Sequence, residues 1–419
     1  MRLCFMIHAL SSGGAERVLS ELANHYARKG IHDVHLITLQ PKDTPSFYAL
    51  DPSITLHQLG LNQGGAGGLS KIKRVLGRLF SMRRMLKNLQ PHKIISFVDE
   101  MNIAILLATL GLSIPVVISE RTDPRRHSIG VLGNIGRRLI YPLAFRLVLQ
   151  GNYVRSCFPY LSQKTTVISN PVAFPKDAAS KIESSFIIML VGRLDCYKGH
   201  YELIQAFSTL AQKFPKWSLE IYGEGPEKDN LEKLIAKHSL QECAFLKGVS
   251  SPIQKELKRA SLFAFPTHYE GFSNALAEAM ALGLPVVASN CDGNLELVEH
   301  EKNALVFPVG DVDKLAEQLS LLMSDAELRV TLGKAARQSI KKFAPEKIYK
   351  MWDEVIETSA DDSFGDKKAK ARLSRDARTE GTLTFPRSLF TFFCQGCKTA
   401  MLSPSAGLPI EGEQVGKKT

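Results

Sequence analysis

Along the first 120 residues, the spacing of hydrophobic residues alternates between two patterns. Short, continuous apolar runs are separated by longer stretches in which apolar residues recur every three or four positions. This pattern predicts short buried strands that alternate with amphipathic helices. The expected strands are 3–8, 34–39, 93–97 and 116–119, and the expected helices are 15–29, 69–89 and 102–110.

The same alternation returns after residue 185. Strands that alternate with helices favour parallel sheets built from βαβ units. Because 419 residues are more than one hydrophobic core usually holds, the sequence predicts an α/β protein with two facing Rossmann-like domains and a ligand cleft between them. The expected strands are 186–191, 218–222, 244–246, 262–265, 286–288 and 304–307, and the expected helices are 201–213, 227–238, 252–259, 274–282, 312–323, 325–343 and 347–359.

The composition divides the chain further. Residues 1–170 form the expected first domain, and a hinge at 166–171 leads into a second domain at 171–345. Residues 360–419 are polar and charged and then rich in Gly, Pro and Ser, so we expect a disordered tail. Residues 101–118 are apolar enough to be considered for a membrane span. Asn102, Gly111 and Pro115 instead favour a buried helix, a turn and a strand there.

The positive charge is concentrated in the first domain. Residues 1–180 carry 22 Lys and Arg against 10 Asp and Glu, whereas residues 181–355 carry 21 against 24. A basic half favours an anionic partner, such as a phospholipid surface, a lipid diphosphate or nucleic acid. A basic face that is merely solvated is the alternative. Nucleic acid has only this charge in its favour, and we expect no nucleic-acid partner.

The helix predicted at 69–89 is basic and amphipathic. Such a helix can lie on an anionic membrane surface. The alternative is a helix that packs on the sheet with its basic face in solvent. Its cations are Lys71, Lys73, Arg74, Arg78, Arg83, Arg84 and Lys87, and its expected apolar stripe is 72, 75, 76, 79, 82, 86 and 89.

The cysteines suggest a reducing compartment. There are seven, an odd number, and their spacing shows no disulfide framework. The pair Cys394 and Cys397 has no second pair to complete a zinc site. No convincing signal peptide opens the chain, since the apolar start is short and polar residues follow at once. We therefore expect a cytoplasmic protein.

One segment indicates a ligand-binding site most clearly. It is Glu270-Gly-Phe-Ser-Asn-Ala-Leu-Ala-Glu278. It runs from a predicted strand through a loop into a predicted helix. The start of a helix offers free backbone N–H groups and a positive dipole end, which together bind diphosphates. Backbone donors would come from Phe272, Ser273 and Asn274. Glu270 and Glu278 place one carboxylate on each side of this predicted diphosphate-binding site.

Two cations follow the predicted strand 186–191. Arg193 and Lys198 can hold a diphosphate without a metal and can stabilise the negative charge of a leaving nucleotide. The alternative is a pair of ordinary surface cations. Asp311 and Asp313 form the Asp-x-Asp triplet that is usual for metal-dependent sugar transfer. Because the triplet precedes a predicted helix, we interpret it as a helix cap and expect no metal.

These motifs carry a family resemblance. Glu270 to Glu278, followed by Ala-Met-Ala-x-Gly-x-Pro-Val-Val-Ala, resembles the donor-site motif of the retaining glycosyltransferases of sequence family 4, which have a GT-B fold. Three further segments fit the same family in the same order: Ser12-Gly-Gly-Ala-Glu-Arg17, Val191-Gly-Arg-Leu-Asp-x-x-Lys-Gly199 and Gly223-Glu-Gly-Pro226. The resemblance covers roughly residues 1–358 and implies that helix 346–359 packs back on the first domain.

The resemblance implies a role for each site residue. Glu270, Arg193 and Lys198 are expected to be catalytic, with Glu270 facing the donor sugar. Glu278 should accept hydrogen bonds from the ribose hydroxyls. The remaining donor-binding residues are Gly13, Gly14, Gly223, Phe272, Ser273 and Asn274. Where relatives carry a histidine, this chain has Glu120 and Arg121, which we expect on the acceptor side.

The segment 96–102 and the opening Gly-Gly-Ala-Glu-Arg further resemble bacterial N-acetylgalactosaminyltransferases that extend lipid-linked oligosaccharides. The implied enzyme moves a hexose or N-acetylhexosamine from a UDP-sugar to a saccharide or polyprenyl-diphosphate-linked acceptor in polysaccharide or lipopolysaccharide biosynthesis. It would need no cofactor and would lie on the inner face of the membrane. A nucleotide-sugar epimerase, a phosphorylase and a non-catalytic nucleotide-sugar-binding protein are the alternatives. A nicotinamide oxidoreductase is disfavoured because Gly-x-Gly-x-x-Gly is missing.

Overall fold

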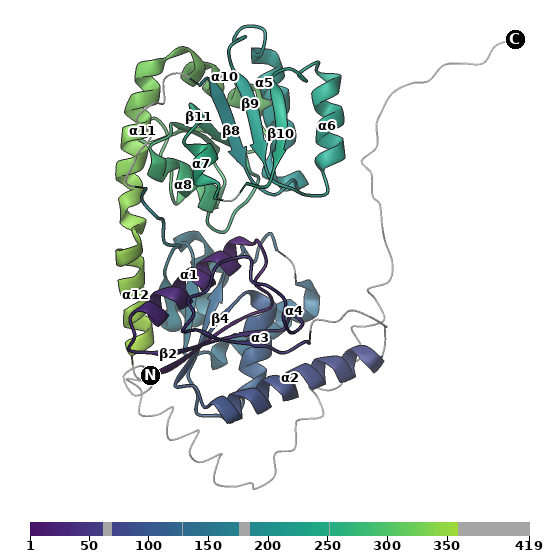
Figure 1. Ribbon diagram of the computed structural model, residues 1–419, viewed down its shortest axis with the longest axis vertical. Helices are drawn as coiled ribbons and strands as arrows, with labels where there is room; N and C mark the ends of the chain where they lie inside the picture. Colours follow the sequence, from purple (N-terminus) through teal and green to yellow (C-terminus); the bar gives the residue numbers. More distant parts are fainter. Residues whose placement is uncertain (62–68, 128, 176–184, 251, 359–419) are drawn as a thin grey trace, which may run out of the picture. The chain divides into compact units, whose positions relative to one another are not determined.

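The computed structural model describes residues 1–61, 69–127, 129–175, 185–250 and 252–358. Residues 1–65 and 74–363 belong to one compact unit, which contains two separate sheets (Figure 1). The described residues 69–73 are assigned to a second unit. The tail expected at 360–419 and the pair Cys394 and Cys397 therefore lie outside the described residues.

The first sheet has seven strands in the order β3-β2-β1-β4-β5-β6-β7, and every pairing is parallel. Four α-helices connect the strands. The strands are β1 (Arg2–Ile7), β2 (Asp33–Thr38), β3 (Thr55–Gln58), β4 (Lys93–Phe97), β5 (Val116–Glu120), β6 (Arg146–Leu149) and β7 (Thr165–Val167), and the helices are α1 (Gly14–Arg28), α2 (Leu69–Leu89), α3 (Asp99–Ala108) and α4 (Gly130–Ile140).

The second sheet has six parallel strands in the order β10-β9-β8-β11-β12-β13. Its strands are β8 (Ile187–Val191), β9 (Ser218–Tyr222), β10 (Ala244–Gly248), β11 (Leu262–Phe265), β12 (Val286–Ser289) and β13 (Leu305–Phe307). Its helices are α5 (His200–Leu210), α6 (Lys228–Lys237), α7 (Gln254–Leu257), α8 (Asn274–Leu282), α9 (Asp292–Leu295), α10 (Val312–Ser324) and α11 (Ala326–Ile340).

Both sheets have the strand order of a Rossmann fold, so the expected fold class is confirmed. The order reverses between β1 and β4 in the first sheet and between β8 and β11 in the second. Ligands of open α/β sheets bind beside the carboxyl ends of the strands at such a switch point. The segments 192–199 and 266–274, which follow β8 and β11, therefore lie where the fold favours a ligand.

The strands are buried on both faces, as parallel strands covered by helices must be. Phe5, Phe97, Phe207 and Phe263 are fully buried, and each lies in or beside one of the two sheets. The apolar segment 101–118 forms most of α3, a turn at Gly111 and strand β5, as expected. Among the described helices, none is both long and apolar enough to cross a membrane.

The last described helix, α12 (Pro345–Glu357), contacts residues of the first sheet. Trp352 is buried and its ring stacks on Phe97, with 6.0 Å between centroids. The Lys93 ammonium donates hydrogen bonds to the carbonyls of Val355, Ile356 and Thr358 at 3.1, 2.6 and 2.8 Å. A cation there satisfies carbonyls that the end of a helix leaves without partners.

Candidate active site

An ion pair joins the loops that follow β8 and β11. The Lys198 ammonium lies 2.5 Å from Oε1 of Glu270, and both side chains are largely buried, at 17% and 14% exposure. Thr267 also donates to the same carboxylate oxygen, at 3.4 Å. The structure therefore brings together two of the three residues expected to be catalytic, at the switch point of the second sheet.

Gly199 explains why a glycine follows this lysine. Its φ is +74°, a left-handed conformation that disfavours other residues, and a Cβ there would lie 2.1 Å from the carbonyl oxygen of Pro266. The residue is also the N-cap of α5. Gly199 thus allows the chain to turn sharply against the end of β11, which places Lys198 beside Glu270.

Arg193 lies apart from that pair. Its side chain is 69% exposed, and its Nε contacts the carboxylate of Asp195 at 3.2 Å. An exposed arginine on a loop after a strand can change rotamer at little cost. The structure therefore places Arg193 on the same loop as Lys198 but does not show it in contact with Lys198 or Glu270.

The start of α8 is held in place by buried amide and hydroxyl groups. Ser273 is the N-cap residue, is buried, and donates its hydroxyl to Asn294 at 2.6 Å. The Asn170 side-chain amide donates to the side-chain oxygen Oδ1 of Asn274 at 2.7 Å. A Cβ on Gly14, at the start of α1, would come 2.9 Å from the Asn274 amide nitrogen. Gly14 and Asn274, expected from the sequence to share a donor site, are therefore neighbours.

Phe272 lies next to the N-cap of α8 and is buried. Its ring packs edge-on against Phe343, with 5.4 Å between centroids. The side chain thus anchors the loop, and only its backbone is left for a ligand.

Glu278 is buried, and an arginine of the other domain reaches it. Arg17 of α1 donates from Nη1 to Oε1 of Glu278, and from Nε to Glu21 at 2.9 Å. Gln254 is 3.5 Å from the other Glu278 oxygen. Burial raises the pKa of Glu278 above its usual value, although Arg17 pulls it down. At neutral pH the arginine therefore favours a carboxylate with one oxygen oriented by a cation.

Gly13 and Gly223 are glycines for different reasons. The Glu16 carboxylate folds back over Gly13, so that a Cβ there would lie 2.1 Å from Glu16 Oε2. Glu16 is the third residue of α1, and an acidic residue at this position often folds back to cap the start of its helix. Gly223 has a φ of +150° and lies against the carbonyl oxygen of Gly192, where a Cβ would come within 1.9 Å. Gly223 therefore supports the loop that carries Arg193.

The structure places Glu120 and Arg121 in the interior. Glu120 is the last residue of β5, one residue beyond the predicted strand, and is 1% exposed. It accepts a hydrogen bond from Tyr141 at 2.8 Å and lies 3.4 Å from Arg137. Burial raises its pKa to about 7. Direct contact between this carboxylate and an acceptor would require it to leave the interior.

Arg121 is 7% exposed, and its guanidinium lies over the Phe97 ring, 3.8 Å from the centroid. It also donates to Asn170 at 2.8 Å, and burial lowers its pKa to about 9. Asn170 in turn holds Asn274. Arg121 is therefore connected to the start of α8 through one buried amide.

Sequence patterns do not reveal Asn170 and Tyr153 as parts of this site. Asn170 falls in the expected hinge, and no motif indicates Tyr153. The Tyr153 hydroxyl lies 2.8 Å from the carbonyl oxygen of Glu270 and 2.7 Å from that of Gly271. The position of Asn170 directly before a proline at the expected domain boundary is the one available signal.

The arrangement can bind a diphosphate and a ribose at the same time. The start of α8 supplies backbone donors, Lys198 supplies a cation, and Glu278 supplies hydrogen-bond acceptors. Asp311 is confirmed as a helix cap, since its carboxylate accepts from the Lys314 backbone at 2.9 Å. Within the described ranges, His, Cys, Asp and Glu side chains form no group of three that could hold a metal ion.

Two family models match successive parts of the chain. The family model described as Glycosyltransferase Family 4 matches residues 12–173. The model described as Glycosyl transferases group 1 matches residues 174–339. The first contains Gly13, Gly14 and Arg17, and the second contains the Lys198 and Glu270 pair and Glu278.

Two relatives come from Campylobacter jejuni. One is a GalNAc-alpha-(1->4)-GalNAc-alpha-(1->3)-diNAcBac-PP-undecaprenol alpha-1,4-N-acetyl-D-galactosaminyltransferase, 26% identical over 85% of this chain and 98% of its own length. The other is an N-acetylgalactosamine-N,N'-diacetylbacillosaminyl-diphospho-undecaprenol 4-alpha-N-acetylgalactosaminyltransferase, 28% identical over 83% of this chain and 97% of its own.

Among solved structures, the Anabaena protein HepE in complex with UDP and glucose is similar to this chain. Its TM-score is 0.67 at 19% identity, over 85% of this chain and 99% of that one. At this identity the likeness shows the fold, which is GT-B. The chain belongs to the GT-B glycosyltransferases, with a first domain of Glycosyltransferase Family 4 and a second of the Glycosyl transferases group 1.

Proposed function

We propose that this glycosyltransferase moves a hexose or N-acetylhexosamine from a UDP-sugar to a lipid-linked saccharide, with retention of the anomeric configuration. The observation that carries the proposal is the Lys198–Glu270 pair, which lies at the switch point of the second sheet beside the start of α8. UDP is bound in the related HepE structures, and the Campylobacter relatives are named for undecaprenol-linked acceptors.

The donor phosphates would lie at the start of α8, within reach of Lys198. In the reaction the bond between the anomeric carbon and the leaving phosphate oxygen breaks, and the acceptor hydroxyl oxygen bonds to the same carbon. The hydroxyl proton passes to the leaving phosphate. Lys198 would stabilise the charge that grows on that phosphate, and Glu270 would hold a hydroxyl of the sugar.

Arg193 would complete the phosphate site by a change of rotamer. Among the ion pairs of the described residues, the contact with Asp195 is the one that holds its exposed side chain. A bound diphosphate offers it a bidentate partner, which is stronger than one exposed contact. Positive charge from Lys198 and Arg193 would then perform the task that a metal ion performs in other sugar transferases.

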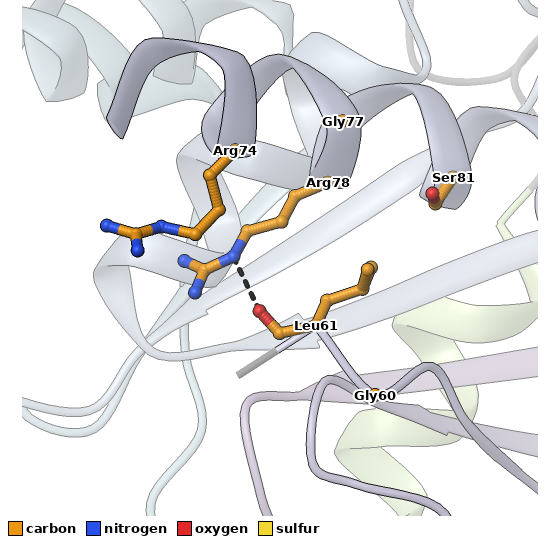
Figure 2. Close-up of a pocket in the computed structure, with 6 residues that line it drawn as sticks. All are labelled: Gly60, Leu61, Arg74, Gly77, Arg78 and Ser81. Carbon is orange, nitrogen blue, oxygen red and sulfur yellow. Dashed lines mark hydrogen bonds between the residues drawn. The ribbon is translucent and has the colours of Figure 1, made fainter. Parts of the chain in front are cut away.

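The proposed binding of a lipid-linked acceptor depends on α2. A cavity of about 300 Å³ lies between α2 and the segment after β3, lined by Gly60, Leu61, Arg74, Gly77, Arg78 and Ser81 (Figure 2). Arg74 and Arg78 are four residues apart, so both leave the helix on the side where Leu61 lies. Arg78 is fixed by a 2.7 Å hydrogen bond from Nε to the Leu61 carbonyl. We propose that the Arg78 guanidinium, which lines this open pocket, binds an anion such as a lipid diphosphate.

The exposed side of α2 supports contact with a membrane. Val75, Leu76 and Phe80 are 38%, 45% and 70% exposed, whereas Met82 and Leu86 are buried. The predicted apolar stripe therefore packs on the sheet only in the second half of the helix. Exposed apolar side chains beside Lys73 and Arg84 are suited to the headgroup region of an anionic bilayer. We propose peripheral binding at the inner face of the cell membrane through the segment Lys71–Lys87, of which the side chains from 73 onward are described.

The test begins with thermal unfolding in the presence of UDP-, GDP- and ADP-sugars, followed by an assay of UDP release with a lipid-linked acceptor. We expect stabilisation by a UDP-sugar, release of UDP only with acceptor, and an α-linked product by NMR. Unchanged transfer after treatment with EDTA is expected if Lys198 and Arg193 replace a metal. Turnover of the donor without acceptor would instead indicate an epimerase, and binding without any turnover a non-catalytic protein.

A further inference from the structure

Arg17 connects the first domain to the nucleotide site. It lies one turn inside α1, directly after the glycines of the first domain, and it hydrogen-bonds to Oε1 of Glu278 in α8. The side chains of Arg17 and Glu278 are 22% and 7% exposed. Among the described residues, Arg17 is the one cation paired with this carboxylate, and Gln254 supplies its other polar contact at 3.5 Å.

A carboxylate in the interior needs a charged or hydrogen-bonding partner. Without one, burial favours the protonated form, which is a poorer acceptor and carries a proton on one oxygen. Two hydroxyls of a ribose can both donate to an ionised carboxylate. An arginine on one oxygen leaves the second oxygen and the remaining lone pairs free for these donors.

We propose that Arg17 is a positioning residue that orients the Glu278 carboxylate for the ribose of the donor nucleotide, so that α1 of the first domain takes part in nucleotide binding. This rests on the proposed function of Glu278. The contact also makes binding depend on the approach of α1 to α8. A nucleotide that uses Glu278 would thereby favour the state in which both domains are together.

Arg17 has a second carboxylate partner besides Glu278. Its Nε is already bonded to Glu21, four residues along the same helix, at 2.9 Å. The charges of Arg17 and Glu21 act on Tyr48, which donates to the Gly13 carbonyl oxygen at 3.2 Å, and on Tyr349 of α12. The pKa of each tyrosine is raised, so neither hydroxyl ionises near neutral pH. Glu278 and Glu21 are the carboxylates that contact Arg17.

The experiment measures UDP binding by calorimetry from pH 5.5 to pH 9 in the full-length protein. The variants are Arg17→Met, Arg17→Lys, Glu21→Gln and Glu278→Gln. We expect Arg17→Met to weaken binding by about tenfold near neutral pH and to recover part of the loss as the pH rises, because Glu278 then ionises only at higher pH. Arg17→Lys should keep the wild-type pH profile with a smaller loss of affinity.

Glu21→Gln is the matched control, since it removes the other carboxylate of Arg17 and leaves Glu278 intact. We expect its affinity to stay within about twofold of the wild type. Should Arg17→Met be unfolded by circular dichroism, Arg17→Gln repeats the measurement, since it also removes the charge.

The outcomes separate this inference from the proposed function. Wild-type affinity and an unchanged pH profile in Arg17→Met, together with weak binding by Glu278→Gln, would overturn the role of Arg17 alone. Tighter binding by Arg17→Met would also overturn it, because the arginine would then compete with the ribose. If Glu278→Gln bound UDP as well as the wild type, the ribose role of Glu278 would itself be wrong. If the wild-type protein did not bind UDP, the proposed donor would fail, and the role of Arg17 with it.

Discussion

The ammonium of Lys198 lies 2.5 Å from the carboxylate of Glu270, although the two residues are 72 positions apart in the chain. The two side chains follow β8 and β11, which are hydrogen-bonded neighbours on either side of the strand-order reversal. In the free protein the pair neutralises two charges that are mostly buried. A bound donor would separate them, so that the cation is available to the phosphate and the carboxylate to the sugar.

We expect Lys198→Ala to lower kcat/KM by about 10²- to 10³-fold, because a cation directed at the leaving phosphate stabilises the transition state. Steady-state assays of UDP release measure this. Lys228→Ala is the matched control, since the ion pair that Lys228 forms with Glu224, at 3.7 Å, is exposed. A loss of less than about tenfold in Lys198→Ala would contradict the role of this lysine in catalysis.

Gly199→Ala should destabilise the second domain by about 2–4 kcal/mol, because the new methyl group would meet the Pro266 carbonyl and φ is +74°. Chemical unfolding measures the change. Gly77→Ala offers the opposite case, since no atom of the surroundings lies within 4 Å of the place that the new methyl group would take on this helix. We expect it to raise the free energy of unfolding by about 0.5–1 kcal/mol.

The sequence allows most of the second domain to be predicted, because its strands are continuous apolar runs bounded by turn residues. Strands β9 and β11 and helix α8 begin and end at the predicted residues. Helix α4 escapes prediction, since Gly130, Gly133 and Gly136 give it a low helix propensity. Contact with α3 stabilises it instead, as where Gly136 approaches Ile103. Packing between two helices cannot be recognised from the local sequence of either one.

Strands β3, β6 and β7 and the short helix α9 also escape prediction. Each contains only three or four residues, and β3, β7 and α9 also lack the continuous apolar run that marks the equally short β11. β7 lies at the start of the segment that the sequence indicates as a hinge. The strands β3 and β7 are edge strands, and their side chains are less completely buried than those of the central strands.

The site could be predicted in part. The sequence placed Lys198 and Glu270 after two predicted strands, and the carboxyl ends of parallel strands lie at one edge of a sheet. It could not predict that Arg17 reaches Glu278 or that Asn170 reaches Asn274, since these contacts join residues of different sheets. The sequence predicted that β5 ends at residue 119, whereas the strand continues through Glu120, and this side chain is buried.

Glu120 should make the stability of the protein depend on pH. Its pKa is raised to about 7 in the folded state, above the usual value of 4.5, because burial disfavours the charge. The folded state therefore binds more protons than the unfolded state between about pH 4.5 and pH 7, and stability falls as the pH rises through this window. Glu120→Gln removes this titration.

Unfolding in urea at pH 5 and pH 8 measures the effect. The loss of stability between these pH values should be smaller in Glu120→Gln than in the wild type by about 2.5 kcal/mol. Glu224→Gln, at an exposed glutamate of the second domain, serves as control and should keep the wild-type difference. Equal pH dependence in Glu120→Gln and the wild type would show that Arg137 holds Glu120 ionised throughout.

Phe80→Asp should weaken binding to anionic vesicles. Phe80 is 70% exposed on α2, and its insertion among lipid headgroups would remove a large apolar side chain from water, a gain of about 1.5–3 kcal/mol. An aspartate loses this gain and adds repulsion from the lipid charge, so we expect binding to fall by at least about tenfold. Co-sedimentation with vesicles of phosphatidylglycerol at low salt measures this binding.

Leu321→Asp, at a 46% exposed leucine of α10, is the control. It introduces the same charge in the second domain and should leave binding to the vesicles unchanged. Equal losses in both variants would mean that net charge, rather than α2, determines contact with the membrane.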